Sequence, residues 1–158
     1  MFEEILAALV ARGIRFVVIG GVAATVHGSA RFTNDIDLCY DTAPDNLERL
    51  VQQLTGWHAY LRGVERGLPF VMDVRALRTT PIMTLTTDVG AIDLLDLVPG
   101  VGDYAKAFAV SEPVRIGKVE FRALQLEALI ASKKAVRRPK DVEHLIELEA
   151  LLALRKRA

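Results

Sequence analysis

Two carboxylates at alternate positions are the first residues in this sequence whose types and spacing could support catalysis. Asp35 and Asp37 stand in the run Asp-Ile-Asp-Leu-Cys-Tyr, in which the first acidic and apolar residues alternate. Side chains two positions apart on a β-strand point to the same face, so the two carboxylates project together. Like charges side by side are unfavourable unless a cation lies between them. The pair therefore predicts a site for Mg²⁺ or Mn²⁺, hard cations that prefer carboxylate oxygens. The alternative is the solvated face of an edge strand.

A pair of glycines upstream is the second feature. Gly20 and Gly21 follow residues 16–19, an apolar and β-branched run that predicts a buried strand, and precede residues 22–27, which are compatible with a short helix. Glycines let backbone N–H groups approach a phosphate closely, and a helix N-terminus adds a favourable dipole. The pair indicates phosphate binding or, alternatively, a simple tight turn.

Two polar residues precede the carboxylates in a predicted loop over residues 28–34. The guanidinium of Arg31 could contact a triphosphate through two parallel hydrogen bonds. Thr33 could bond a phosphate or order the loop. Solvation of the loop is the alternative reading for both residues.

The order and spacing of these motifs resemble the nucleotidyltransferase superfamily related to DNA polymerase beta. The sequence reads Val18-Ile19-Gly20-Gly21, then thirteen residues, then Asp35-Ile36-Asp37-Leu38. The family's pattern is a strand, Gly-Gly or Gly-Ser, roughly a dozen residues and Asp-x-Asp. The resemblance runs from about residue 14 to residue 148. Further residues are similar to a narrower branch, which contains small bacterial AbiEii-type toxins and related nucleotidyltransferases: Ala23, His27, Gly28, Arg31 and Thr33.

The resemblance implies a third carboxylate on a neighbouring strand, for metal coordination or for activation of the acceptor hydroxyl. Asp93, in the run over residues 90–95, fits the family layout best. Asp73, in a predicted strand near residues 69–75, is the alternative. Asp88 suits a turn, and Asp96 would face away from Asp93.

A basic segment near the C-terminus looks like the family's Lys…Arg-Pro-Lys-Asp run. The resemblance implies that Lys133, on a helix opposite the carboxylates, holds the nucleotide phosphates, and that Asp141 orients Lys133. The alternative is a basic helical surface without a ligand.

The implied activity is transfer of a nucleoside monophosphate from a nucleoside triphosphate to an acceptor hydroxyl, with Mg²⁺ or Mn²⁺. The acceptor would be a tRNA end, a protein or a small molecule, and a toxin–antitoxin system is a plausible setting. The alternative is a non-catalytic protein of the same fold that holds a partner, as an antitoxin would. The expected catalytic and metal-binding residues are Asp35, Asp37 and Asp93, and the expected nucleotide-binding residues are Gly20, Gly21, Arg31, Thr33 and Lys133.

The bulk composition fits this interpretation. The 158 residues predict one domain over residues 1–158, and the balance of 20 basic and 20 acidic residues argues against a nonspecific nucleic-acid coat. Cys39, the single cysteine, lies in an apolar run and predicts buried packing. No apolar stretch is long enough to span a membrane, and acids stand where a secretory signal would carry bases. A soluble cytoplasmic protein is the default expectation.

The pattern of elements predicts an α+β fold, with a mixed β-sheet flanked by helices and a helical C-terminal part over about 124–154. The predicted helices cover residues 2–11, 22–27, 44–54, 104–108, 124–136 and 139–154, and the predicted strands cover residues 16–19, 35–40, 69–75 and 82–97, the last interrupted near 88–90, with a hairpin over 114–121.

Overall fold

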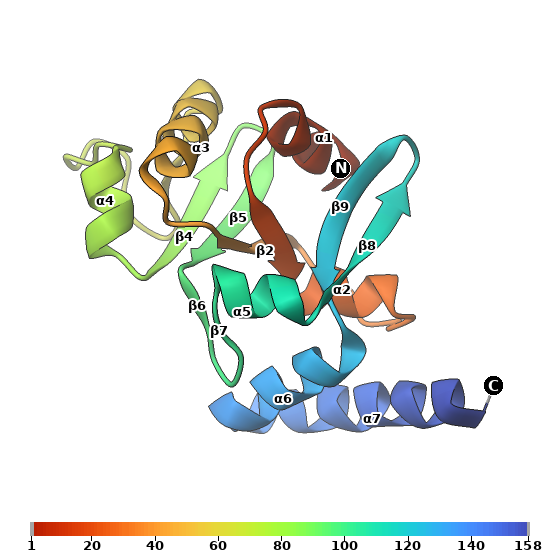
Figure 1. The fold of residues 1–158 in the computed structure, drawn as a ribbon. Coiled ribbons are helices and arrows are strands. Elements are labelled where there is room, and N and C mark those ends of the chain that lie inside the picture. The colour runs from red at the N-terminus through yellow and green to blue at the C-terminus, as the bar shows by residue number, and fades with distance from the viewer. Residues whose placement is uncertain (1, 158) are drawn as a thin grey trace.

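A mixed β-sheet forms the centre of the computed structural model, which describes residues 2–157 (Figure 1). Within these residues the sheet has seven strands in the order β3-β4-β5-β2-β1-β9-β8, and β6 and β7 form a separate pair. The strands are β1 (Phe16–Ile19), β2 (Asp35–Tyr40), β3 (Tyr60–Leu61), β4 (Ile82–Thr87), β5 (Gly90–Leu95), β6 (Leu97–Val98), β7 (Gly102–Asp103), β8 (Ser111–Ile116) and β9 (Val119–Leu124).

Helices cover the sheet and extend from one end of it (Figure 1). They are α1 (Phe2–Ala11), α2 (Gly20–Val26), α3 (Pro44–Gly56), α4 (Val74–Thr79), α5 (Tyr104–Ala109), α6 (Leu126–Val136) and α7 (Val142–Arg157), with the 3₁₀ turn η1 (Pro139–Asp141) before α7. Helices α6 and α7 contact each other and lie side by side beyond the end of the sheet (Figure 1). These elements confirm the predicted α+β fold with a helical C-terminal part.

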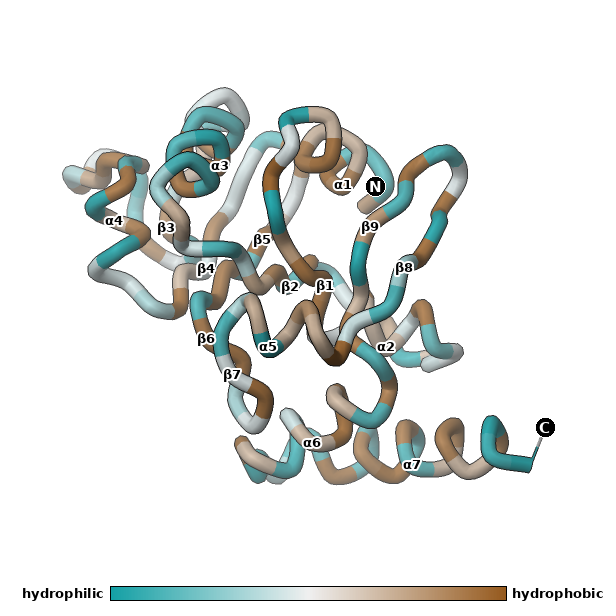
Figure 2. The backbone as a smooth tube through the Cα atoms, in the orientation of Figure 1, coloured by the Kyte–Doolittle hydropathy of each residue, from teal (hydrophilic) through white to brown (hydrophobic). Residues whose placement is uncertain are grey.

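The central strands are buried because their sequences are apolar. All four residues of β1 are buried, and β4 alternates between exposed and buried residues, as a strand with one solvent-facing side must. Figure 2 shows hydrophobic segments along the central strands, whereas the outer turns of α3 are hydrophilic. Helix α1 adds Ile5, Leu6 and Leu9 to the same core. Burial of these side chains supplies the main driving force for the fold.

The pairing around β2 determines which residues meet. Strand β2 pairs antiparallel with β1 and parallel with β5, with Asp37 opposite Asp93. Strands β4 and β5 pair antiparallel on either side of the interruption predicted near residues 88–90. The hairpin predicted over residues 114–121 consists of β8 and β9, joined at Gly117-Lys118.

The prediction of a strand near residues 69–75 is wrong. Helix α4 begins at Val74, and Asp73 is its N-cap, whose carboxylate accepts a hydrogen bond from the N–H of Ala76 at 2.8 Å. The β-forming side chains of this segment favoured a strand, but a capping aspartate stabilises the start of a helix. Helix α2 also begins earlier than predicted, at Gly20 itself.

Within residues 2–157, no helix has both the length and the apolar character needed to cross a membrane.

Candidate active site

Three carboxylates from two neighbouring strands form the chemical centre of the structure. Asp35 and Asp37 point to one face of β2, and the parallel pairing with β5 places Asp93 beside Asp37. Oxygen atoms of the three side chains lie within 4.8 Å of one another. This set of hard oxygen donors suits Mg²⁺ or Mn²⁺. The sequence analysis predicted these three residues as the catalytic and metal-binding set, and in the structure they lie together.

Burial and mutual repulsion both act against the charged form of the cluster. Burial, followed by the charges of Asp93 and Asp35, raises the pKa of Asp37 to about 8. Burial also raises the pKa of Asp93, although the guanidinium of Arg62 opposes this effect. The charged form of the cluster is therefore unfavourable without further positive charge, which a divalent cation would supply.

Arg62 is the main residue of the centre that the sequence analysis missed. Its Nη2 donates to Asp93 Oδ1 at 2.6 Å, and its Nη1 lies 3.5 Å from Asp35 Oδ2. Arg62 directly follows β3, an edge strand of two residues. No local signal could have identified it, because its position depends on the pairing of β3 with β4 and on the pairing of β4 with β5.

The glycine pair fits closely around the carboxylates. Gly20 has a positive φ of 63°, and a Cβ atom there would overlap the carboxylate of Asp37. A Cβ atom at Gly21 would lie 2.9 Å from Thr33 Oγ1. Side chains at these two positions would therefore displace Asp37 or Thr33, so the turn requires glycine.

Hydrogen bonds to α7 fix the loop over residues 28–34. The hydroxyl of Ser29 donates to Glu147 Oε1 at 2.6 Å, and the N–H of Ala30 donates to Glu147 Oε2 at 3.0 Å. These bonds hold the pKa of Glu147 below its ordinary value. At the other end of the loop, Thr33 Oγ1 lies 3.0 Å from the carbonyl oxygen of Asp35 and 3.3 Å from its Oδ1.

A small cationic cavity of about 160 Å³ adjoins the carboxylates. Its lining includes four of the five expected nucleotide-binding residues, all except Gly20, which is the neighbour of Gly21 in the turn. The complete lining consists of Gly21, Arg31, Phe32, Thr33, Lys133, Arg138, Lys140, Asp141 and His144. Arg138 and Lys140 belong to the basic segment singled out in the sequence, whereas Phe32 and His144 gave no signal.

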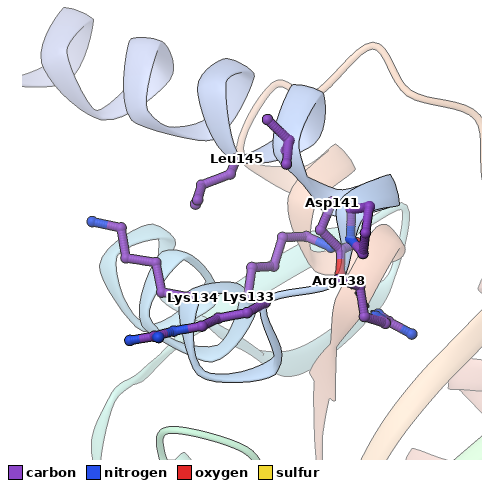
Figure 3. Close-up of a pocket in the computed structure, with 8 residues that line it drawn as sticks. Lys133, Lys134, Arg138, Asp141 and Leu145 are labelled. Atoms are coloured by element: carbon purple, nitrogen blue, oxygen red, sulfur yellow. Dashed lines mark hydrogen bonds and ion pairs between the residues drawn. The ribbon is translucent and has the colours of Figure 1, made fainter.

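Lys133 lies between this cavity and a larger one of about 560 Å³ between α6 and the start of α7. Its Nζ lies 3.2 Å from Asp141 Oδ1, and Figure 3 shows the side chain extending from α6 toward Asp141. Arg138 Nε donates to the other oxygen of Asp141 at 2.8 Å. Burial raises the pKa of Asp141, but Arg138 and Lys133 outweigh it and leave the pKa below its ordinary value. Asp141 thus fixes the position of Lys133.

Residues outside the cluster have structural roles. Asp73 caps α4 through its contact with Ala76, and Cys39 is fully buried. The Nε2 of His27 lies 2.8 Å from the carbonyl oxygen of Leu124, and its Nδ1 lies 2.8 Å from Nη2 of Arg155. His27 therefore bridges β9 and α7.

Comparison with known proteins agrees with the fold and the motif. A family model described as "Nucleotidyl transferase of unknown function (DUF2204)" matches residues 1–157. The chain therefore belongs to this family, and with it to the nucleotidyltransferase superfamily. No curated protein matches the sequence.

Solved structures with the same fold are distant in sequence. The antibiotic-resistance factor ANT(2'')-Ia, crystallised with adenylyl-2''-tobramycin, is 17% identical, with coverage of 99% of this chain and 95% of that chain and a TM-score of 0.56. A protein described as a nucleotidyltransferase from Thermotoga maritima is 14% identical, with coverage of 99% and 91% and a TM-score of 0.53. An antigenic nucleotidyltransferase-like protein from Paracoccidioides brasiliensis is 16% identical, with coverage of 96% and 73% and a TM-score of 0.57. At these identities, the comparison establishes a shared fold.

Proposed function

We propose that this protein transfers a nucleoside monophosphate from a nucleoside triphosphate to an acceptor hydroxyl, with Mg²⁺ or Mn²⁺ as cofactor. The observation that carries the proposal is that the carboxylate cluster and the cationic cavity lie next to each other. Thr33 contacts Asp35 of the carboxylate cluster and also lines the cationic cavity. A triphosphate in that cavity would have its α-phosphate beside the carboxylates.

In this reaction the acceptor oxygen attacks the α-phosphorus. A new P–O bond forms, the bond between the α-phosphorus and the bridging oxygen breaks, and pyrophosphate leaves. Asp35, Asp37 and Asp93 would hold the metal, which when bound polarises phosphate oxygens and activates the attacking oxygen. Asp93, the third carboxylate of the cluster, would also accept the acceptor's proton.

The cationic side chains have the complementary task. Arg31 and Lys133 would bind the β- and γ-phosphates and offset the charge that develops on pyrophosphate. Gly20 and Gly21 let the backbone approach the phosphate, because neither carries a side chain in the narrow space beside Asp37 and Thr33. Asp141 holds Lys133 in place for this contact.

The acceptor class is part of the proposal. The related fold of ANT(2'')-Ia, crystallised with adenylyl-2''-tobramycin, makes a small-molecule hydroxyl one candidate. A tRNA end and a protein hydroxyl are the other two, with a toxin–antitoxin partner as the setting that the AbiEii-like motif suggests.

Transfer of label tests the proposal. Purified protein with Mg²⁺ and each α-³²P-labelled nucleoside triphosphate would be offered bulk tRNA, cell protein and aminoglycosides in separate reactions. We expect label on one acceptor class and its loss in Asp35→Asn, with Asp73→Asn as a matched acidic control that keeps activity.

A binding measurement keeps the test independent of the acceptor. We expect Mg²⁺ with the correct triphosphate to raise the melting temperature of the wild-type protein and of Asp73→Asn but not of Asp35→Asn. Equal stabilisation of all three proteins, or of none, would contradict a metal-dependent nucleotide site and favour a partner-binding role.

A further inference from the structure

Arg62 occupies the side of the carboxylate cluster where a cation is needed. Its guanidinium bridges Asp93 and Asp35, at distances of 2.6 and 3.5 Å, and thus uses oxygens of two of the three carboxylates. Asp35 and Asp93 are also two of the three residues whose carboxylate oxygens could hold a divalent cation. We propose that Arg62 competes with the divalent cation for Asp35 and Asp93, so that metal binding displaces its guanidinium. This inference rests on the metal site of the proposed function and assigns it a means of regulation.

The side chain of Arg62 can change its rotamer while its backbone stays paired. Its backbone N–H donates to the carbonyl oxygen of Thr84 at 2.9 Å, which continues the pairing of β3 with β4. The side chain is long and flexible, and about a third of it is exposed, with 32% of its surface accessible. Rotation about side-chain bonds therefore suffices to release the carboxylates.

The contacts of the guanidinium are incomplete. Within residues 2–157, the buried Nε of Arg62 has no hydrogen-bond partner. A buried donor without a partner is unfavourable, so displacement of the guanidinium toward solvent would relieve this defect. Nη2 also donates to the carbonyl oxygen of Leu85 at 2.7 Å.

The charges also favour replacement by a metal. One guanidinium faces three acidic side chains, and its ion pairs are with Asp35 and Asp93. A divalent cation brings twice the positive charge of a guanidinium. The arginine thus stabilises the metal-free cluster in part and raises the metal concentration needed to load it, since a competing state lowers apparent affinity in proportion to its population.

The test is Mn²⁺ binding followed by electron paramagnetic resonance, without nucleotide and without turnover. We expect Arg62→Met to bind Mn²⁺ about tenfold more tightly than the wild type, the scale of one lost hydrogen bond between charged groups. In EDTA the same variant is expected to melt at a lower temperature, because the carboxylates lose their counter-charge. Arg62→Lys keeps a charge but loses the two-point contact. Its Mn²⁺ affinity is expected to lie between those of the wild type and Arg62→Met.

Arg66→Met is the matched control. It removes an arginine of the same segment, whose guanidinium lies over the ring of Tyr60 rather than on a carboxylate, and should leave Mn²⁺ affinity unchanged. Equal or weaker Mn²⁺ binding by both Arg62 variants would overturn the competition. A different result would defeat the proposed function instead: no Mn²⁺ binding by the wild type or any Arg62 variant, or binding unaffected by Asp35→Asn.

Discussion

At the residue scale, the site depends on one glycine as much as on its carboxylates. Gly20 stands in the left-handed region with φ of 63°, and its Cα faces the Asp37 carboxylate without room for a side chain. The backbone of the turn can therefore approach the charged cluster closely. Strain and lack of space both act against any other residue at this position.

Gly20→Ala is therefore expected to lower the free energy of unfolding by about 1–3 kcal/mol, the usual strain of a non-glycine residue in an unfavourable backbone region. Because Asp37 must also shift, Mn²⁺ affinity should fall. Urea unfolding and Mn²⁺ titration measure the two effects.

Gly56→Ala provides the comparison. Gly56 ends α3, and a Cβ atom there would meet nothing within 4 Å. We expect its stability to be unchanged or raised by up to about 1 kcal/mol, since alanine is the better helix former. If Gly20→Ala were as stable as Gly56→Ala and bound Mn²⁺ normally, the close fit around Asp37 would be refuted.

At the element scale, the third carboxylate comes from strand β5 and not from the segment before α4. The alternation in β5 and its parallel pairing with β2 place Asp93 beside Asp37. The segment around Asp73 has a similar composition, but its aspartate accepts a hydrogen bond from the N–H of Ala76 and begins a helix. Local composition alone does not separate these two outcomes, because both segments are rich in strand-forming residues.

Asp73→Ala is expected to lower the free energy of unfolding by about 1 kcal/mol, the usual effect of losing an N-cap. Mn²⁺ affinity should stay at the wild-type level, because Asp73 takes no part in the cluster. Chemical denaturation and Mn²⁺ titration check both expectations, with Asp93→Ala as the variant that should abolish Mn²⁺ binding. Impaired Mn²⁺ binding in Asp73→Ala would contradict this and indicate that Asp73 contributes to the metal site.

Local signals account for what the sequence predicted correctly. Alternation identified β2, and strand-forming residues identified β4 and β5. Glycines with an apolar run identified β1 and the turn at Gly20. The family resemblance added Asp93 and Lys133. Arg62 was missed because its contacts with Asp35 and Asp93 cross 27 and 31 positions through an edge-strand pairing. Such a contact leaves no periodic trace in the sequence.

At the scale of the whole molecule, zero net charge conceals a separation of charge. Three carboxylates gather on β2 and β5, whereas basic side chains from the loop over residues 28–34 and from residues 133–140 line the adjoining cavity. We expect the distribution of charge, rather than its sum, to make the proposed site complementary to a metal-bound polyphosphate.

Lys133→Met is expected to weaken binding of inorganic tripolyphosphate about tenfold, as expected for one lost charged hydrogen bond. Isothermal titration calorimetry at fixed ionic strength measures this affinity. Lys134→Met makes the same change of charge at the neighbouring residue. Lys134 pairs with Glu149 at 3.0 Å and is not among the residues that line the cationic cavity. Equal affinities of the two variants would show that Lys133 has no special role in phosphate binding.

The anchoring of the loop to α7 also has a kinetic meaning. Ser29 and Glu147 are 118 positions apart in the chain, and His27 and Arg155 are 128 apart. Contacts of such long range close large loops, at an entropic cost that grows slowly with loop length, and a high share of them slows folding. The carboxylate cluster needs pairing among strands β1, β2 and β5, whereas the cationic cavity needs α6 and α7 docked. We therefore expect the proposed polyphosphate site to form after the carboxylate cluster during folding, and to be lost first when α7 detaches.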